Sequence, residues 1–171
     1  MKQEKNGVYE NEISENDEML NNTALNELHK EIDLIQNCIT RMAQNSFIIK
    51  GWAFMLVVGL IALTSDKFNL YILCGIGIFI LIIFWYLDAF FLKMEKLYRF
   101  KYEWVIAKRV EGIKDYMYDL NPHQSKTRMP EKVVPSVGSV MFSEPHTLLL
   151  FYGSPIVIGL LVILLRILCL I

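Results

Sequence analysis

The chain has 171 residues, of which 54% are apolar and 20% are charged, and its formal net charge is −1. This length suggests one domain, or one small domain with appendages. Three apolar runs, residues 47–64, 68–92 and 148–171, hold only one charged residue each. A helix that crosses a bilayer needs about 20 mostly apolar residues. The pattern excludes an ordinary soluble domain and predicts an all-α integral membrane protein with three transmembrane helices.

The segment before the first run divides into two parts. Residues 1–20 are acidic and weakly apolar, and we predict a disordered tail there. Residues 21–46 carry an apolar stripe whose spacing alternates between three and four residues, which is typical of a coiled coil or of a helix in a bundle. The stripe consists of Leu25, Leu28, Ile32, Ile35, Ile39 and Met42. It predicts a cytoplasmic amphipathic helix that either packs on its own chain or joins chains into a homo-oligomer.

The first two apolar runs predict a transmembrane hairpin over residues 47–92. Lys50 lies at the start of its first span, and Asp88 lies four residues before the end of its second. A charge inside a span is costly unless it is paired or close to the interface. Three interpretations stay open: an ion pair or hydrogen bond between Lys50 and Asp88, separate snorkelling of each side chain, and a role in gating or conduction.

The helical pattern continues past the second span into residues 93–118, which predicts a second cytoplasmic helix antiparallel to residues 21–46, the two together forming a helical stalk. Basic residues gather here: Lys93, Lys96, Arg99, Lys101, Lys108 and Arg109. They are typical of the cytoplasmic flank of a span, and they also offer contacts to anionic lipid or nucleic acid. Residues 119–147 contain four prolines and predict a cytoplasmic loop, with a short extended piece within residues 131–142.

The third span, residues 148–171, contains one proline and one charge. Pro155 either begins the helix, with Ser154 as its N-cap, or bends a helix that starts earlier. Arg166 is either anchored at the outer surface by snorkelling or belongs to a ring of arginines around a pore, which would favour anions. The sequence leaves both alternatives open.

The basic residues that flank the spans predict the orientation, because Lys and Arg are retained on the cytoplasmic side. Arg41 precedes the first span and four basic residues follow the second within residues 93–101, whereas the turn between the spans offers only Lys67. We therefore expect a membrane protein with a cytoplasmic N-terminus and a C-terminus toward the outside.

The sequence contains no common catalytic motif. Its three histidines, His29, His123 and His146, lie on unrelated segments. Its three cysteines, Cys38, Cys74 and Cys169, match neither zinc-site nor redox spacing. We expect no enzyme activity, no metal and no cofactor.

Three stretches, "QNCITRMAQNSFIIKGWAFMLV", "FWYLDAFFLKMEKLYR" and "FSEPHTLLLFYG", carry a resemblance over most of residues 35–155. The chain resembles small bacterial three-span membrane effectors of anti-phage defence, including the Hailong type. The resemblance implies an oligomeric channel that is held closed until infection and then depolarises the cell, as in abortive infection. It also implies a nucleotidyltransferase partner whose DNA oligomers keep the effector closed, with Lys101, Lys108 and Arg109 as candidate oligonucleotide contacts.

Three helices in one chain cannot enclose an aqueous path, so a pore would need several chains. The leading expectation is a homo-oligomeric channel whose cytoplasmic helices sense a ligand or partner. The alternative is a non-conducting membrane anchor or adaptor that recruits a cytoplasmic partner through the same helices. A small transporter ranks third, since the sequence has no evident broken or repeated helices.

Overall fold

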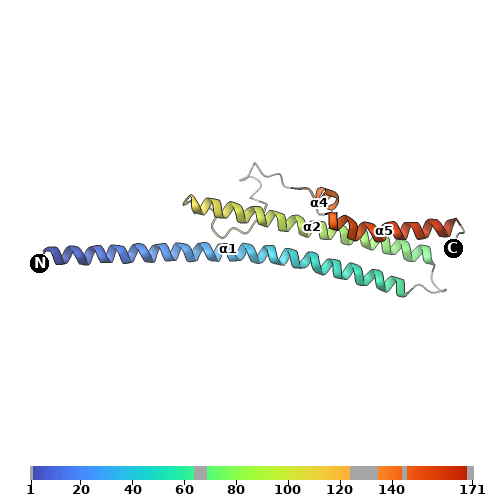
Figure 1. Cartoon of the computed structure of the whole chain (residues 1–171), viewed down its shortest axis with the longest axis horizontal. Coiled ribbons are helices and arrows are strands. Elements are labelled where there is room, and N and C mark those ends of the chain that lie inside the picture. Colours follow the sequence, from blue (N-terminus) through green and yellow to red (C-terminus); the bar gives the residue numbers. More distant parts are fainter. Residues whose placement is uncertain (1, 64–68, 124–134, 144–145, 169–171) are drawn as a thin grey trace.

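The computed structural model describes residues 2–63, 69–123, 135–143 and 146–168. These ranges contain four helices and no strand: α1 (Lys2–Ala62), α2 (Leu70–Val110), α4 (Val137–Ser143) and α5 (His146–Ile167). Figure 1 shows α1 and α2 running antiparallel, with α5 along the part of α2 nearest the turn between them and α4 beside the start of α5. The described chain is therefore all-helical.

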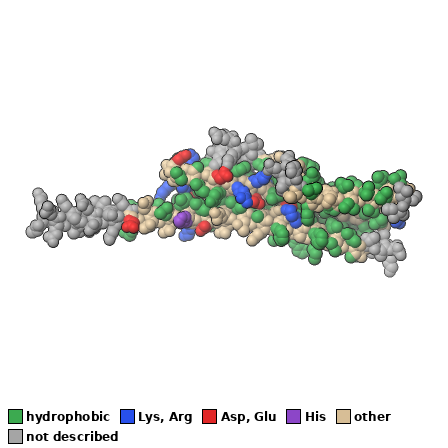
Figure 2. Space-filling model, in the orientation of Figure 1, with side chains coloured by type: hydrophobic (Ala, Val, Ile, Leu, Met, Phe, Trp, Pro, Cys, Tyr) green, Lys and Arg blue, Asp and Glu red, His purple; other side chains and the backbone are tan. Residues whose placement is uncertain are grey.

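Three of the helices, α1, α2 and α5, are long and apolar enough to cross a membrane. At 1.5 Å per residue, the 22 residues of α5 span about 33 Å, close to the thickness of a hydrocarbon layer. The 41 residues of α2 span about 62 Å and the 61 residues of α1 about 92 Å. Both long helices therefore extend well past one side of any bilayer that contains α5. Hydrophobic side chains cover the end where α5 lies, and charged side chains appear farther along (Figure 2).

α1 starts earlier than the sequence predicted. Its backbone is helical from Lys2, where we expected a disordered tail over residues 1–20, and residue 1 lies outside the described range. The segment contains no proline, and a helix that is nucleated by a packed region adds further residues at little cost. Met19 and Leu20 on this part are 61% and 69% exposed. The two apolar side chains described on this extension are thus open to the surroundings.

α2 ends earlier than predicted, at Val110 rather than near Tyr118. Gly112 has a φ of +76°, its N–H donates to the Arg109 carbonyl, and the Ile113 N–H donates to the Lys108 carbonyl. These two bonds and the left-handed glycine form a Schellman motif, which closes a helix. The predicted helix over residues 93–118 continued through Gly112, whereas in the structure this glycine ends the helix.

The loop predicted for residues 119–147 contains a helix. α4 covers Val137–Ser143, where we expected an extended piece, and residues 131–134 of that piece lie outside the described ranges. The Ser136 hydroxyl accepts a hydrogen bond from the Ser139 N–H at 3.0 Å, which caps the first turn. Val140 is 1% exposed and belongs to the main core. Burial of this apolar face decides in favour of a helix.

α5 is one helix from His146 to Ile167 with Pro155 inside it. The structure therefore selects the second alternative for this proline: it lies within a helix that has already started, two turns beyond His146. Proline removes one backbone hydrogen bond from a helix interior, and such a loss is tolerated in membrane spans when neighbouring helices support the backbone.

Two clusters of buried residues join the helices. The larger contains Ala53 of α1, Trp85 and Ala89 of α2, and Leu148 and Tyr152 of α5, together with Leu81 and Val140. The alanines are 1% and 0% exposed, and small residues let membrane helices approach closely. The smaller cluster joins Ile35 of α1 to Trp104 and Val105 of α2. α1 and α2 are thus held together both inside the apolar region and beyond it.

Candidate functional site

The most unusual feature of the molecule is an ion pair within the apolar helices. The Lys50 Nζ lies 2.6 Å from the Asp88 Oδ2 and donates to the Asp88 Oδ1 at 2.9 Å. The Asp88 side chain is 0% exposed, whereas the Lys50 side chain is 28% exposed. The structure therefore contains the pairing that the sequence offered as one of three interpretations, with the carboxylate inside and the ammonium stem reaching toward the surface.

Ser46 completes the inner face of this pair. It lies one turn before Lys50 on α1, its hydroxyl donates to the Asp88 carboxylate, and the Lys50 Nζ donates to the Ser46 oxygen at 2.8 Å. Ser46 is 4% exposed. A buried carboxylate needs hydrogen-bond donors to offset its loss of hydration, and the ammonium and the hydroxyl supply them. We name Ser46, Lys50 and Asp88 the intramembrane polar cluster.

α5 closes the cluster from the third side. The Tyr152 phenol is buried and close enough to Asp88 to interact with its carboxylate, although its hydroxyl does not meet hydrogen-bond geometry. Its ring stacks on Trp85, with centroids 6.5 Å apart. The Trp85 Nε1 is buried and has no hydrogen-bond partner in the described part of the chain. Two buried polar groups, a hydroxyl and an indole N–H, therefore lie beside the ion pair with unused hydrogen-bonding capacity.

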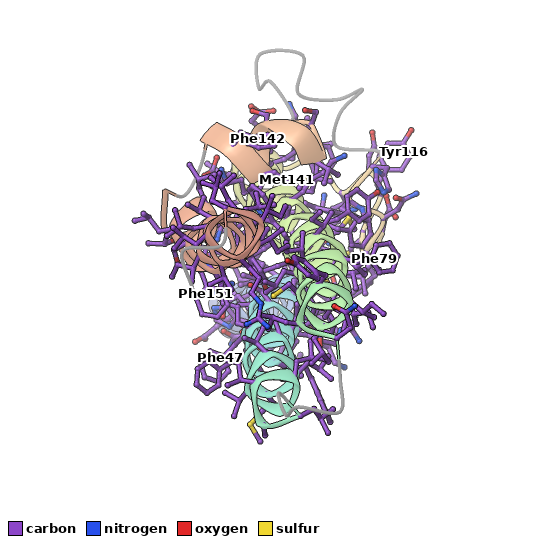
Figure 3. All side chains as sticks on the ribbon, turned by 90° about the vertical axis from the view of Figure 1, so that its right-hand side faces the viewer. Phe47, Phe79, Tyr116, Met141, Phe142 and Phe151 are labelled. Atoms are coloured by element: carbon purple, nitrogen blue, oxygen red, sulfur yellow. The ribbon has the colours of Figure 1, made fainter. Side chains whose placement is uncertain are left out.

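α4 covers the same aromatic group. The Phe142 ring meets Trp85 edge to face with centroids 5.2 Å apart, and Figure 3 shows Met141 and Phe142 on the α4 side of the bundle. By contrast, Phe47 and Phe79 point away from the three helices in the same view, and they are 78% and 64% exposed. The buried Asp88 carboxylate thus lies inside the bundle, whereas these two phenylalanine side chains of the spans face outward.

A second buried ion pair joins α1 to α2 outside the most apolar region. The Arg109 Nε and Nη2 donate to the two Glu31 oxygens at 2.9 and 3.0 Å, and the Tyr118 N–H donates to the Glu31 Oε1 at 3.1 Å. The Glu31 and Arg109 side chains are 1% and 6% exposed. Tyr116 and Tyr118 have φ values of +58° and +59°, a conformation that costs about 1–3 kcal/mol per residue. Glu31 therefore holds a strained turn against α1.

Two residues of the predicted basic contact surface are buried in the structure. The Lys101 side chain is 2% exposed, lies 3.2 Å from the Asp119 carboxylate and donates to the Asn121 carbonyl. Arg109 is occupied by Glu31, as described above. Both side chains are thus buried and paired within the chain, which does not favour them as contacts to an oligonucleotide or a lipid headgroup, and their role as ligand contacts stays a prediction.

The other basic residues lie nearer the surface. Lys108 pairs with Glu111 at 2.6 Å and Arg99 pairs with Glu95 at 2.7 Å. Lys93 and Lys96 are half-buried. Arg166 is exposed in the last turn of α5, remote in sequence from the polar cluster. Its two interpretations, an anchor or a pore residue, both stay predictions.

The apolar stripe on α1 packs largely on its own chain. Ile35 is 1% exposed and contacts Trp104 and Val105, and Ile39 packs on the same cluster. The neighbours Leu28, Ile32 and Met42 are half-buried, whereas Leu25 is 49% exposed. The centre of the stripe is therefore used within the chain, and its N-terminal end remains available.

Several residues of these sites were not singled out from the sequence. Ser46 lies four residues from Lys50, so the spacing alone could have indicated it. Trp85 and Tyr152 lie in apolar runs where an aromatic side chain carries no special signal. Nothing in the local pattern around Glu31 signals a partner that is 78 residues away.

No known family model, characterised protein or solved structure matches this chain. The fold and the polar cluster together define its class: an all-helical protein with three helices able to cross a membrane.

Proposed function

We propose that this protein is a homo-oligomeric membrane channel, an effector of bacterial anti-phage defence that a cytoplasmic ligand or partner holds closed and that depolarises the membrane when released. The intramembrane polar cluster carries the proposal. An ionised residue inside a span is costly, up to about 2.5–3.5 kcal/mol at the centre on insertion scales, and such residues mark ion pathways and gates. A simple anchor needs only apolar helices, so the ion pair favours a function beyond anchoring.

The placement of charge supports a cytoplasmic N-terminus and a bacterial inner-membrane location. The described basic residues of α2 beyond residue 92 and Arg41 of α1 lie at the same end of the three spans. Arg166 is the one described basic residue near the opposite end of the spans. Retention of Lys and Arg in the cytoplasm then orients the chain. In this orientation Lys50 and Asp88 lie near the cytoplasmic ends of their spans, where a cytoplasmic ligand can act on them through α1 and α2.

The exposed end of the α1 stripe supplies a route to assembly. Leu25, the N-terminal member of the stripe, is 49% exposed, and Met19 and Leu20, on other faces of the same part of α1, are 61% and 69% exposed. Exposed apolar side chains of a helix associate with another helix. Several copies joined in this way would bring several polar clusters around one axis, which a single chain cannot do.

A flux assay tests the proposal directly. The purified chain is placed in vesicles that hold a potassium gradient, and membrane potential is followed with a dye. We expect the wild-type chain to carry current and Asp88→Asn to change it, because the carboxylate fixes the position of Lys50. Vesicles that remain tight at every protein density, with the chain inserted and folded, would contradict conduction.

Assembly is tested by substitutions that spare the intrachain contacts. Leu25→Glu places a charge on the exposed end of the stripe, and Asn26→Glu places the same charge one residue further along, at an exposed position off the stripe. We expect Leu25→Glu to reduce oligomer mass in light scattering and to weaken depolarisation in cells, and the control Asn26→Glu to do neither. Equal behaviour of the two variants would contradict assembly through this stripe.

A non-conducting adaptor is the second candidate, and the same exposed helix favours it. Met19, Leu20 and Leu25 would then bind a cytoplasmic partner rather than another copy. The adaptor predicts that expression leaves membrane potential unchanged while the Leu25→Glu variant still loses a bound protein. The flux assay therefore separates the two functions.

A further inference from the structure

A second feature of the spans lies apart from the polar cluster. A cavity of about 400 Å³ opens between α1, α2 and α5, at the end where α1 and α2 are joined by their turn. Its walls include Val57 and Leu60 of α1, Cys74 and Gly77 of α2, and Ile158 and Gly159 of α5. This volume falls within the range of about 300–1,000 Å³ that is usual for ligand pockets.

The cavity exists because the three helices pack unevenly. α2 contacts both α1 and α5, but no Cα atom of α1 comes within 8 Å of a Cα atom of α5 in the described residues. Ala53 and Ala89 let α1 and α2 approach closely, whereas α1 and α5 stay apart and leave a space between them. Glycines widen it: a Cβ on Gly77 would meet the Leu60 Cδ1 at 3.4 Å, and one on Gly159 would meet Ile78 at 3.6 Å.

The chemistry of the walls restricts the occupant. Among the described residues, all those that line the cavity are apolar or glycine. Water needs two to four polar partners to occupy a buried site, and an apolar cavity of this kind excludes it. An empty space would forfeit the dispersion contacts of all its lining side chains. An apolar molecule from the surrounding hydrocarbon satisfies both conditions.

We propose that this cavity binds one acyl chain of a membrane phospholipid. The three lining helices are the three candidate spans, so the cavity opens into the hydrocarbon layer, where acyl chains are the abundant apolar species. Val57 lies seven residues after Lys50, about 10 Å farther along α1. An acyl chain between α1 and α5 therefore sets their separation two turns away from the polar cluster. The proposal requires membrane insertion and does not depend on conduction.

Photo-crosslinking tests the site. The full chain in detergent micelles receives near-stoichiometric phosphatidylcholine that carries a diazirine midway along one acyl chain, and adducts are mapped by mass spectrometry. We expect adducts to saturate near one lipid per chain and to concentrate on cavity residues such as Leu60, Cys74 and Ile158. Adducts that rise without saturation and are spread evenly over outward residues such as Phe54 and Phe79 would overturn the proposal.

Two filled-cavity variants and a matched control complete the test. Gly77→Leu and Gly159→Leu place a side chain in the cavity, and Gly75→Leu places the same side chain on α2 where nothing lies within 4 Å. We expect the first two to reduce the saturable adduct about tenfold, the factor that corresponds to 1.4 kcal/mol of lost affinity, and the control to keep it. Equal loss of the saturable adduct in all three variants would overturn the proposal. It would also be overturned if the cavity carried no lipid adduct and Cys74 instead cross-linked two chains, since a second chain would then occupy the cavity.

Discussion

The two buried ion pairs between α1 and α2 each neutralise a buried carboxylate, but they differ in the geometry of the cation. Glu31 and Arg109 form two parallel hydrogen bonds, both side chains are almost fully buried, and the carboxylate also holds the Tyr118 N–H. Lys50 and Asp88 share the hydroxyl of Ser46, and the lysine is 28% exposed. A planar guanidinium fixes the geometry of a pair, whereas an ammonium on a flexible stem can leave it. The Glu31–Arg109 pair is therefore suited to a fixed contact between the two helices, and the Lys50–Asp88 pair to a contact that can open.

The largest effect is expected from breaking the intramembrane pair on its lysine side. Lys50→Met leaves the fully buried Asp88 carboxylate without its cation, which costs about 3–5 kcal/mol of folding free energy. Asp88→Asn should cost less, because the partly exposed Lys50 can reach the interface. Unfolding by sodium dodecyl sulfate in mixed micelles, followed by tryptophan fluorescence, measures both.

The charge-swapped chain provides the control for this asymmetry. Lys50→Asp with Asp88→Lys should recover part of the stability that either single substitution loses. A swapped chain no more stable than the single variants, or an Asp88→Asn chain as unstable as Lys50→Met, would contradict a functional pairing of these two groups.

Glu31→Gln should have the next largest effect, about 2–3 kcal/mol, since it leaves the Arg109 guanidinium buried without a countercharge. Because Glu31 also holds the Tyr118 N–H, amides of residues 111–123 should exchange faster with solvent. Amides of the spans near Asp88 should keep their protection in hydrogen-exchange mass spectrometry. Uniform loss of protection over both regions would show that the two ion pairs do not stabilise their regions independently.

Ser46→Ala should destabilise the chain by about 1.5 kcal/mol, the usual value for a lost hydrogen bond to a charged group. The ion pair stays, so the expected loss is smaller than for Lys50→Met. Ser46→Thr keeps the hydroxyl and serves as the control in the same detergent unfolding measurement. Equal stability of the alanine variant and wild type would mean that the hydroxyl contributes nothing to the cluster.

Gly112→Ala should cost about 1 kcal/mol, because an L-residue is strained at the φ of +76° that this position requires. The effect should stay at the end of α2 and in the turn that Glu31 holds. Gly51→Ala is the control, since Gly51 lies inside α1 with nothing near its Cβ position. A thermal shift of equal size and sign for both would contradict the Schellman motif as the cause.

The smallest effect concerns pH. Burial raises the pKa of the Tyr98 phenol above its usual 10.0, and Cys38 beside it adds to the shift. Above about pH 10 the unfolded chain loses this proton while the folded chain keeps it, so folding stability falls as pH rises, and below that value the group contributes no slope. Tyr98→Phe should flatten the alkaline limb of stability against pH. If the slope of stability against pH were unchanged in Tyr98→Phe, the alkaline loss of stability would come from other groups.

The sequence predicted the three spans because apolar length and isolated charges are properties of the chain itself. It offered Lys50 and Asp88 as partners, since both lie near the same end of the antiparallel hairpin. Tyr152 and Trp85 were beyond reach, because which face of α5 meets α2 depends on tertiary packing. Glu31 shows the same limit: its partner Arg109 is distant in sequence, and both residues resemble ordinary surface charges. The end of α2 could have been predicted from Gly112, which is a common residue after the end of a helix. One glycine is, however, a weak signal when the helical pattern continues on both sides of it.

The uninterrupted hydrogen bonding of α1 has a mechanical consequence. A helix without a break from Lys2 to Ala62 moves as a stiff rod, so a displacement of its N-terminal end is not absorbed along the way. With Glu31 and Arg109 acting as a fulcrum, a sideways push on residues near Leu20 becomes an opposite tilt at Lys50, nineteen residues past that pivot. A binding event far from the lipid could thereby pull an ammonium group off its carboxylate without any change of secondary structure.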